Sequence, residues 1–168
     1  NGNVDDTVVN HGKIVGEVHL GLGNDSFDGK AGTSGAIFGE AGDDTLKGST
    51  HKDVLNGGLG KDGLRGAAGA DKFVFNDVLD SVLGANHDSI LDFSHAKHDK
   101  IDLHLIDANT GTGLDQAFHF IGTKGFHQVA GELRYAHHLL QGDTDGNGTA
   151  DFEIHVNLAH LVKGDFVL

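Results

Sequence analysis

The stretch GGLGKDGLR, from Gly57 to Arg65, decides the fold of this chain. It is a nonapeptide of the form G-G-x-G-x-D-x-U-x, in which U is a large apolar residue. Residues 66–74 keep the pattern with one glycine replaced, and residues 39–47 fit it as well. Residues 48–56 keep the aspartate and the apolar residue but carry a histidine where a glycine is expected. Four consecutive units therefore follow one another in one register.

Upstream of residue 39 the repeat is degenerate, and its period becomes 19 residues. The positions of Gly23, Asp25 and Phe27 recur 19 residues later, and residues 6–8 superpose on residues 25–27 at the same spacing. Nineteen residues equal two nonapeptides and one inserted residue. We therefore expect the same architecture to continue upstream with a bulge in each turn.

The repeating unit predicts an all-β fold, a parallel β-roll. Its residues G-G-x-G-x-D favour a turn, and x-U-x favours a short strand whose apolar residue points inward. Two units make one coil, and the strands of successive coils stack about 4.8 Å apart. The inward positions are expected to form an internal ladder made of Val18, Phe27, Ile37, Leu46, Leu55, Leu64 and Phe73.

Turns that are two units apart lie above one another, so each stacked pair brings carbonyl oxygens and two aspartate carboxylates together. Hard oxygen ligands in a flexible cage of six or more suit Ca²⁺ better than Mg²⁺ or Zn²⁺. We expect Asp44 and Asp62 to share one ion, Asp53 and Asp71 another on the opposite edge, and Asp25 and Asp44 a third. The alternative is that these aspartates only cap their turns and bind no ion. We disfavour it, because stacked carboxylates without cations repel one another.

These turns supply most of the candidate metal ligands of the chain. Asp6 facing Asp25 is a weaker pair, and the turn at residues 29–35 has no aspartate at the ligand position, so we expect its site with Asp53 to be empty. In total we expect about three to six Ca²⁺ ions. The candidate ligands are Gly21, Gly23, Asp25, Gly39, Gly42, Asp44, Asp53, Gly57, Gly58, Gly60, Asp62, Gly66, Gly69 and Asp71.

The composition agrees with this interpretation and excludes several classes of protein. Among 168 residues there are 25 acidic and 12 basic ones, and 21 of the acidic residues are aspartate, which gives a net charge of −13. This charge argues against nucleic acid or an anionic membrane as a partner. Without cysteine there is no disulfide and no thiolate metal site. The sequence has no stretch of about 18 apolar residues, which is the length needed to span a membrane.

From residue 75 onward the nonapeptides give way to longer alternating segments. Their pattern predicts a mostly antiparallel β-sandwich that caps the roll, because the last coil would otherwise expose an apolar edge. We therefore expect two domains, the roll in residues 1–74 and the cap in residues 75–168. The predicted strands of this half are 72–75, 89–93, 100–105, 117–121, 132–135, 152–156 and 166–168.

Both halves resemble known families. The nonapeptides are similar to RTX, or hemolysin-type calcium-binding, repeats, whose family forms calcium-filled parallel β-rolls. The second half resembles the C-terminal domain of serralysin-type secreted metalloproteases, through the segments 69–75, 88–93, 99–103, 131–135 and 150–154.

The serralysin resemblance implies one more site and a signal. It implies a further Ca²⁺ held by Asp80 and Asp88, although the segment between them is one residue longer than is usual in the family. Residues 163–168 match the uncleaved C-terminal signal by which such proteins leave Gram-negative bacteria through type I secretion.

Two further patterns are weaker. Residues 143–151 imitate the first nine positions of an EF-hand loop, but Ile154 stands where its bidentate glutamate belongs, so a hairpin turn is the favoured interpretation. The thirteen histidines lack the spacing of zinc sites, and H-E-x-x-H, G-x-S-x-G and phosphate-loop motifs are absent. We therefore predict that the chain is not an enzyme.

The leading hypothesis is a non-enzymatic module for calcium-dependent folding, stability and type I secretion at the C-terminus of an exported, extracellular bacterial protein. Its expected partners are the secretion machinery and an upstream domain, and we expect a monomer. One alternative is the accessory domain of an exported protease, lipase or alginate epimerase. Another is an adhesion or polysaccharide-binding module, although Tyr135 is the only tyrosine and tryptophan is absent.

Overall fold

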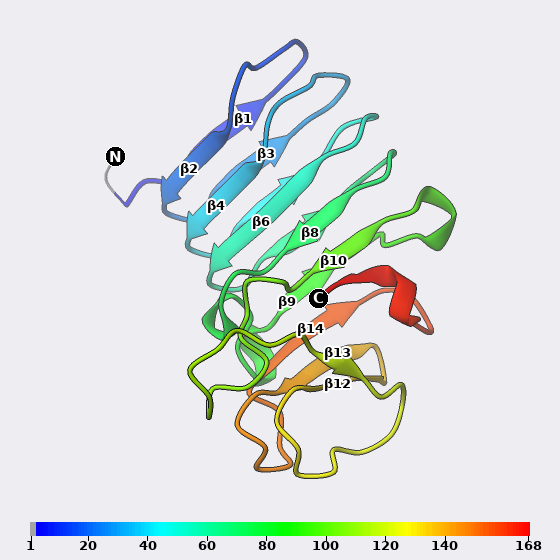
Figure 1. Ribbon diagram of the computed structural model, residues 1–168. Coiled ribbons are helices and arrows are strands. Elements are labelled where there is room, and N and C mark those ends of the chain that lie inside the picture. The colour runs from blue at the N-terminus through cyan, green and yellow to red at the C-terminus, as the bar shows by residue number, and fades with distance from the viewer. Residues whose placement is uncertain (1–2) are drawn as a thin grey trace.

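The computed structural model describes residues 3–168, which form two β-sheets joined by turns and short 3-10 helices (Figure 1). Up to β10 the chain alternates between the sheets, so odd-numbered strands belong to the first and even-numbered strands to the second. The first sheet runs β1 (Thr7–Val9), β3 (Ser26–Asp28), β5 (Thr45–Lys47), β7 (Gly63–Arg65), β9 (Asp88–Ile90), β14 (Phe152–Val156), β13 (Leu139–Asp143), β12 (Glu132–Ala136) and β11 (His119–Phe120). The second runs β15 (Phe166–Val167), β10 (Lys100–Asp102), β8 (Lys72–Val74), β6 (Val54–Leu59), β4 (Ile37–Ala41) and β2 (Val18–Leu22).

Parallel pairing of these short strands confirms the predicted β-roll. From β1 to β14 each neighbour in the first sheet is parallel, and every pair of the second sheet is parallel as well. In Figure 1 the strands β2 to β10 of the second sheet lie side by side, one for each coil. The 3-10 helices lie in the connections and are η1 (Val78–Asp80), η2 (Gly84–Asn86), η3 (His95–Lys97) and η4 (Lys163–Asp165).

The core between the sheets consists of two rows of apolar side chains in strict register. The predicted ladder is confirmed, since its members from Phe27 to Phe73 are at most 1% exposed and Val18, in the outer coil, is partly buried. The row on the first sheet is Val8, Phe27, Leu46, Leu64, Ile90 and Val156. The row on the second sheet is Val18, Ile37, Leu55, Phe73, Ile101 and Phe166.

The expected antiparallel cap is present in part. Among residues 3–168, antiparallel pairing is limited to β12 with β13 and β13 with β14, and β13 was not predicted. Strands β9, β10, β14 and β15 instead extend the two sheets of the roll in parallel. The reason is that Ile90 and Ile101 occupy the next ladder positions, although longer loops have replaced the nonapeptide turns. The proposed division after residue 74 stays a prediction, because both sheets continue across it.

No helix in the described part of the chain is long and apolar enough to cross a membrane.

Candidate metal centre

Four turns of the roll share one backbone conformation. In each of them the second and fourth residues both have positive φ, and the fourth is glycine. The φ angle at this fourth position lies between 130° and 138°, which is accessible to glycine but strained for other residues. The repeat therefore keeps this glycine for a backbone reason. The residue pairs are Gly21 and Gly23, Glu40 and Gly42, Gly58 and Gly60, and Ala67 and Gly69.

In the four turns with paired positive φ angles, the aspartate that ends the turn accepts a hydrogen bond from the coil before it. The Oδ1 of Asp44 accepts the backbone N–H of Asp25 at 2.7 Å, and the Oδ1 of Asp62 accepts that of Asp44 at 2.7 Å. The same contact joins Asp25 to the N–H of Asp6 and Asp88 to the N–H of Asp62, each at 2.7 Å. We call this row the first-edge column; it consists of Asp6, Asp25, Asp44, Asp62 and Asp88.

A shorter row lies on the opposite edge of the roll. The Oδ1 of Asp71 accepts the N–H of Asp53 at 2.9 Å, and the Oδ1 of Asp99 accepts that of Asp71 at 3.1 Å. Asp53, Asp71 and Asp99 form the second-edge column. The structure thus brings the predicted pairs together: Asp44 with Asp62, Asp25 with Asp44, Asp53 with Asp71 and, with an exposed partner, Asp6 with Asp25.

The second carboxylate oxygen of most column members has no partner. Within residues 3–168, no donor reaches the buried Oδ2 atoms of Asp25, Asp44, Asp62, Asp71 and Asp88. These residues are at most 2% exposed. A buried carboxylate oxygen without a hydrogen bond or a cation is strongly unfavourable. Five such atoms in one structural position indicate that a cation belongs there.

The glycines of the turns leave room beside these oxygens. A Cβ on Gly39 would overlap the Oδ2 of Asp44 and would lie 2.5 Å from the carbonyl oxygen of Gly57 in the next coil. A Cβ on Gly57 or Gly66 would likewise overlap the Oδ2 of the aspartate in its own turn. Carboxylate and carbonyl oxygens from successive coils therefore converge on the same small spaces. This all-oxygen donor set fits Ca²⁺.

The electrostatics of the columns point in the same direction. Burial is the largest cause of raised pKa values for these aspartates, and repulsion between neighbouring carboxylates adds to it. The pKa rises to about 6 for Asp44 and Asp71, to about 7 for Asp62 and to about 9 for Asp88. Without a cation these positions resist ionisation, and a bound cation would reverse that preference.

Asp80 lies close to the end of the first-edge column. Its charge raises the pKa of both Asp62 and Asp88, and its own pKa is raised by burial. Its Oδ2 accepts the N–H groups of Asn76 at 2.7 Å and Asp77 at 3.3 Å. The assignment of Asp80 and Asp88 as ligands of a further ion stays a prediction, and the structure places them in one neighbourhood.

Two carboxylates at the second edge were missed by the sequence analysis. Asp99 continues the second-edge column, and Asp92 accepts the N–H groups of Gly66 at 2.8 Å and Ala67 at 3.0 Å. A signal for Asp99 was available: the segment Asp99-Lys100-Ile101 repeats the segment Asp71-Lys72-Phe73. For Asp92 there was none, because its loop follows no repeat.

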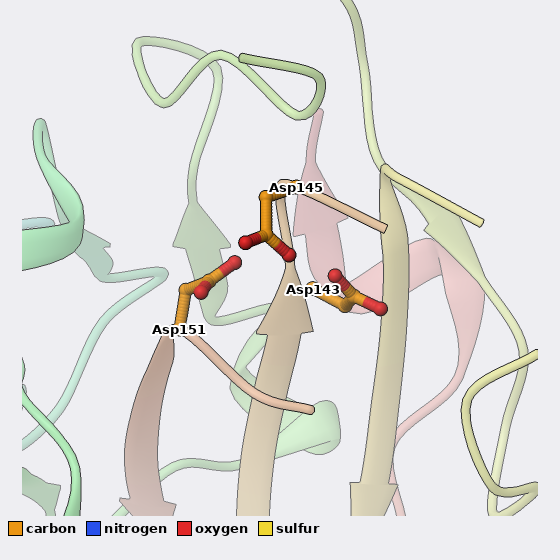
Figure 2. Close-up of side chains that lie close together, drawn as sticks. All are labelled: Asp143, Asp145 and Asp151. Carbon is orange, nitrogen blue, oxygen red and sulfur yellow. The ribbon is translucent and has the colours of Figure 1, made fainter. Parts of the chain in front are cut away.

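The turn between β13 and β14 gathers a separate group of carboxylates. Asp143, Asp145 and Asp151 each offer an oxygen within 4.8 Å of the others, and Figure 2 shows them facing one another. Both oxygens of Asp143 accept N–H groups of the turn, from Gly146 at 2.7 Å and Gly148 at 2.9 Å. The favoured interpretation of this segment as a hairpin is confirmed, because β13 and β14 pair in antiparallel fashion across it.

The alternating strands, glycine turns and stacked aspartates define a β-roll built from nonapeptide repeats. The family model described as the C-terminal domain of peptidase M10 serralysins matches residues 2–168. The chain belongs to this family of C-terminal domains.

A solved structure shows the same fold. The chain is similar to the AlgE6R2 subunit of a mannuronan C5-epimerase from Azotobacter vinelandii, with 24% identity and a TM-score of 0.52, over 99% of this chain and 93% of that one. The AlgE6R3 subunit of the same enzyme is 22% identical, with a TM-score of 0.41, over 97% of this chain and 77% of that one. The first likeness supports the fold alone, and the second carries no argument. A search of curated proteins gave no match.

Proposed function

We propose that this chain is a module for calcium-dependent folding and type I secretion at the C-terminus of an exported protein. The observation that carries the proposal is the set of five buried aspartate oxygens without hydrogen-bond donors in the described chain. Family membership and the all-oxygen donor set support calcium as the missing group. When bound, calcium would supply the positive charge that these carboxylates lack.

The residues of the columns would hold the ions, and the Oδ1 contacts would set their spacing. Asp25, Asp44, Asp62 and Asp88 each use one oxygen to bind the preceding coil and keep the other for an ion. Folding would then be coupled to binding, because the ligands come together only when the coils stack. Extracellular calcium modules have affinities of roughly 10⁻⁴–10⁻³ M, so the chain would stay unfolded at cytosolic calcium levels.

The C-terminal residues are part of the folded structure, which agrees with a signal that is read before folding. Strand β15 pairs with β10, and Phe166 and Asp165 are at most 9% exposed. The Oδ1 of Asp165 lies 2.8 Å from Nδ1 of His95, and its Oδ2 accepts the N–H of Val162 at 2.6 Å. A secretion apparatus would therefore meet Asp165 and Phe166 only in the unfolded chain.

Circular dichroism and calorimetry test the proposal. In excess chelator we expect a largely unfolded chain, and in millimolar Ca²⁺ a β-rich one, because ion binding contributes to the free energy of folding. Asp44→Asn keeps the Oδ1 acceptor and replaces only the unpartnered oxygen, so it should lower the number of bound ions. Asp115→Asn, at an exposed loop residue, is the matched control and should leave that number unchanged. A chain that is fully β-structured in chelator would contradict the proposal.

A further inference from the structure

The turn at residues 48–53 differs in its backbone from the four turns described above. In the turn at residues 48–53, Ser49 occupies the second position and His51 the fourth. Neither residue has positive φ, whereas both positions have it in each of the four turns described above. The backbone of this turn therefore does not present its peptide groups as the other turns do.

The aspartate of this turn is also different, because its second oxygen has donors. The Oδ2 of Asp53 accepts the backbone N–H of Ser49 at 2.6 Å and its hydroxyl at 3.0 Å. The hydroxyl oxygen of Ser49 in turn accepts the N–H of His51 at 3.0 Å. Ser49 is 2% and Asp53 5% exposed, so this contact is buried. It occupies the oxygen that is left without a donor in Asp25, Asp44, Asp62, Asp71 and Asp88.

The surroundings of Asp53 supply few further oxygen ligands for an ion. A Cβ on Gly48 would lie 2.7 Å from the carbonyl oxygen of Gly66 and 2.8 Å from the Oδ2 of Asp53, so these oxygens still converge. However, an N–H dipole and a hydroxyl proton of Ser49 point at the carboxylate oxygen, and both would repel a cation that approached it. The preceding turn on this edge, residues 29–35, supplies no aspartate.

In the next coils of the second edge, hydrogen-bond donors of the protein also occupy most of the oxygens that could bind an ion. The Oδ2 of Asp99 accepts the N–H of Ser94 at 2.9 Å. Asp92 binds the N–H groups at the start of the turn that ends in Asp71, and Nζ of Lys97 donates to the carbonyl oxygen of Ala67 in the same turn. On this edge only Asp71 keeps a fully buried carboxylate oxygen without a donor within residues 3–168.

We propose that the turn at residues 48–53 binds no ion and that Ser49 takes the place of one, so that Asp53 is a structural rather than a metal-binding residue. This differs from the sequence analysis, which assigned Asp53 as a ligand. The two edges of the roll are then stabilised differently, the first by ions between coils and the second mainly by hydrogen bonds. The contrast between the two edges rests on the proposed function, because it requires that calcium binds at the first edge.

Anomalous diffraction from crystals of the unaltered chain grown in Ca²⁺ tests the assignment directly. We expect calcium peaks at the Oδ2 atoms of Asp44 and Asp62 and none at the Oδ2 of Asp53. A peak at all three would overturn this inference and leave the proposed function standing. Peaks at none would overturn the proposed function, and with it the contrast between the two edges.

Ion counting by calorimetry gives a second, independent test. Asp53→Asn should leave the number of bound ions unchanged, whereas Asp44→Asn should reduce it by at least one. An equal loss in both variants would refute the inference.

Substitutions in the turn at residues 48–53 should also restore ion binding to it. Replacing Ser49 and His51 by glycine gives this turn the glycine pair found at Gly21 and Gly23 and at Gly58 and Gly60, and this double variant should bind one ion more than the unaltered chain. Thr50→Gly, in the same turn, is the matched control and should add none. A double variant that folds and gains no ion would contradict the role given to Ser49.

Discussion

The side chain of Asp88 shows what a single residue of this roll has to reconcile. It is fully buried, its Oδ1 accepts the N–H of Asp62, and its Oδ2 has no donor in the described residues. Burial and the nearby Asp62 raise its pKa to about 9. The residue therefore favours the protonated state in the absence of a cation and the ionised state in its presence.

This conflict predicts how the metal-free chain responds to pH. A carboxyl group whose pKa is higher in the folded state stabilises the fold fully below its unfolded pKa, about 3.8 for aspartate, and loses that contribution as the pH rises through the folded value. The folded values are about 6 for Asp44 and Asp71, about 7 for Asp62 and about 9 for Asp88. In chelator, any folded population should thus be largest near pH 4 and should decrease towards pH 9.

Thermal unfolding followed at several pH values, with and without Ca²⁺, measures this effect. Calcium should reverse the trend between pH 4 and 7, because the ion binds the ionised carboxylates. A chelated chain whose stability rises over the same interval would show that these aspartates are solvated in the metal-free state.

At the scale of the element, each three-residue strand of the roll contributes one apolar residue to the rows between the sheets. Leu55 lies in the middle of its row, between Ile37 and Phe73, and is fully buried. Val18 ends the same row in the outer coil and is only partly buried. The stability of a coil therefore depends on its position in the stack as well as on its sequence.

This position dependence predicts different effects for two similar truncations. Leu55→Ala should lower the free energy of unfolding in saturating Ca²⁺ by about 2–5 kcal/mol, because it opens a cavity between two coils. Val18→Ala should cost about 1 kcal/mol, since its side chain is partly solvated in the folded state. Urea denaturation of both variants measures the difference. Equal losses would mean that the outer coil is as tightly packed as the middle of the roll.

The sequence predicted those features that depend on fixed spacing. The apolar rows and the pairs Asp44–Asp62 and Asp53–Asp71 follow from periods of nine and eighteen residues. Strand β13 and the contacts of Asp92 were not predicted, because loops of irregular length set their positions. Asp99 was missed although its segment repeats that of Asp71. The difference of the turn at residues 48–53 could be predicted in part. The sequence shows a histidine in place of a glycine, but it does not show that the hydroxyl of Ser49 reaches Asp53.

At the scale of the molecule, the charge of −13 has to be held around a narrow core. Much of this charge lies on the two edges, where successive aspartates face one another across the coils. Each bound Ca²⁺ would remove two negative charges, so the repulsion that opposes compaction would fall as the ions bind.

The overall dimensions should therefore change strongly with calcium. A chain of this length has a radius of gyration of about 15 Å when compact and about 40 Å when unfolded. Small-angle X-ray scattering should show the larger value in chelator and a value near the smaller one in Ca²⁺. Mg²⁺ at the same concentration is the control, and it should compact the chain less, because it demands stricter octahedral geometry. Equal compaction by both ions would indicate general charge screening.

Strand β15 joins residues 166–167 to β10, which lies more than sixty positions earlier in the chain. During synthesis the outer side of β10 has no neighbour until those residues have left the ribosome. The second sheet therefore stays incomplete until the whole stretch from β10 to β15 has been synthesised, so this pairing is the last of the sheet to form.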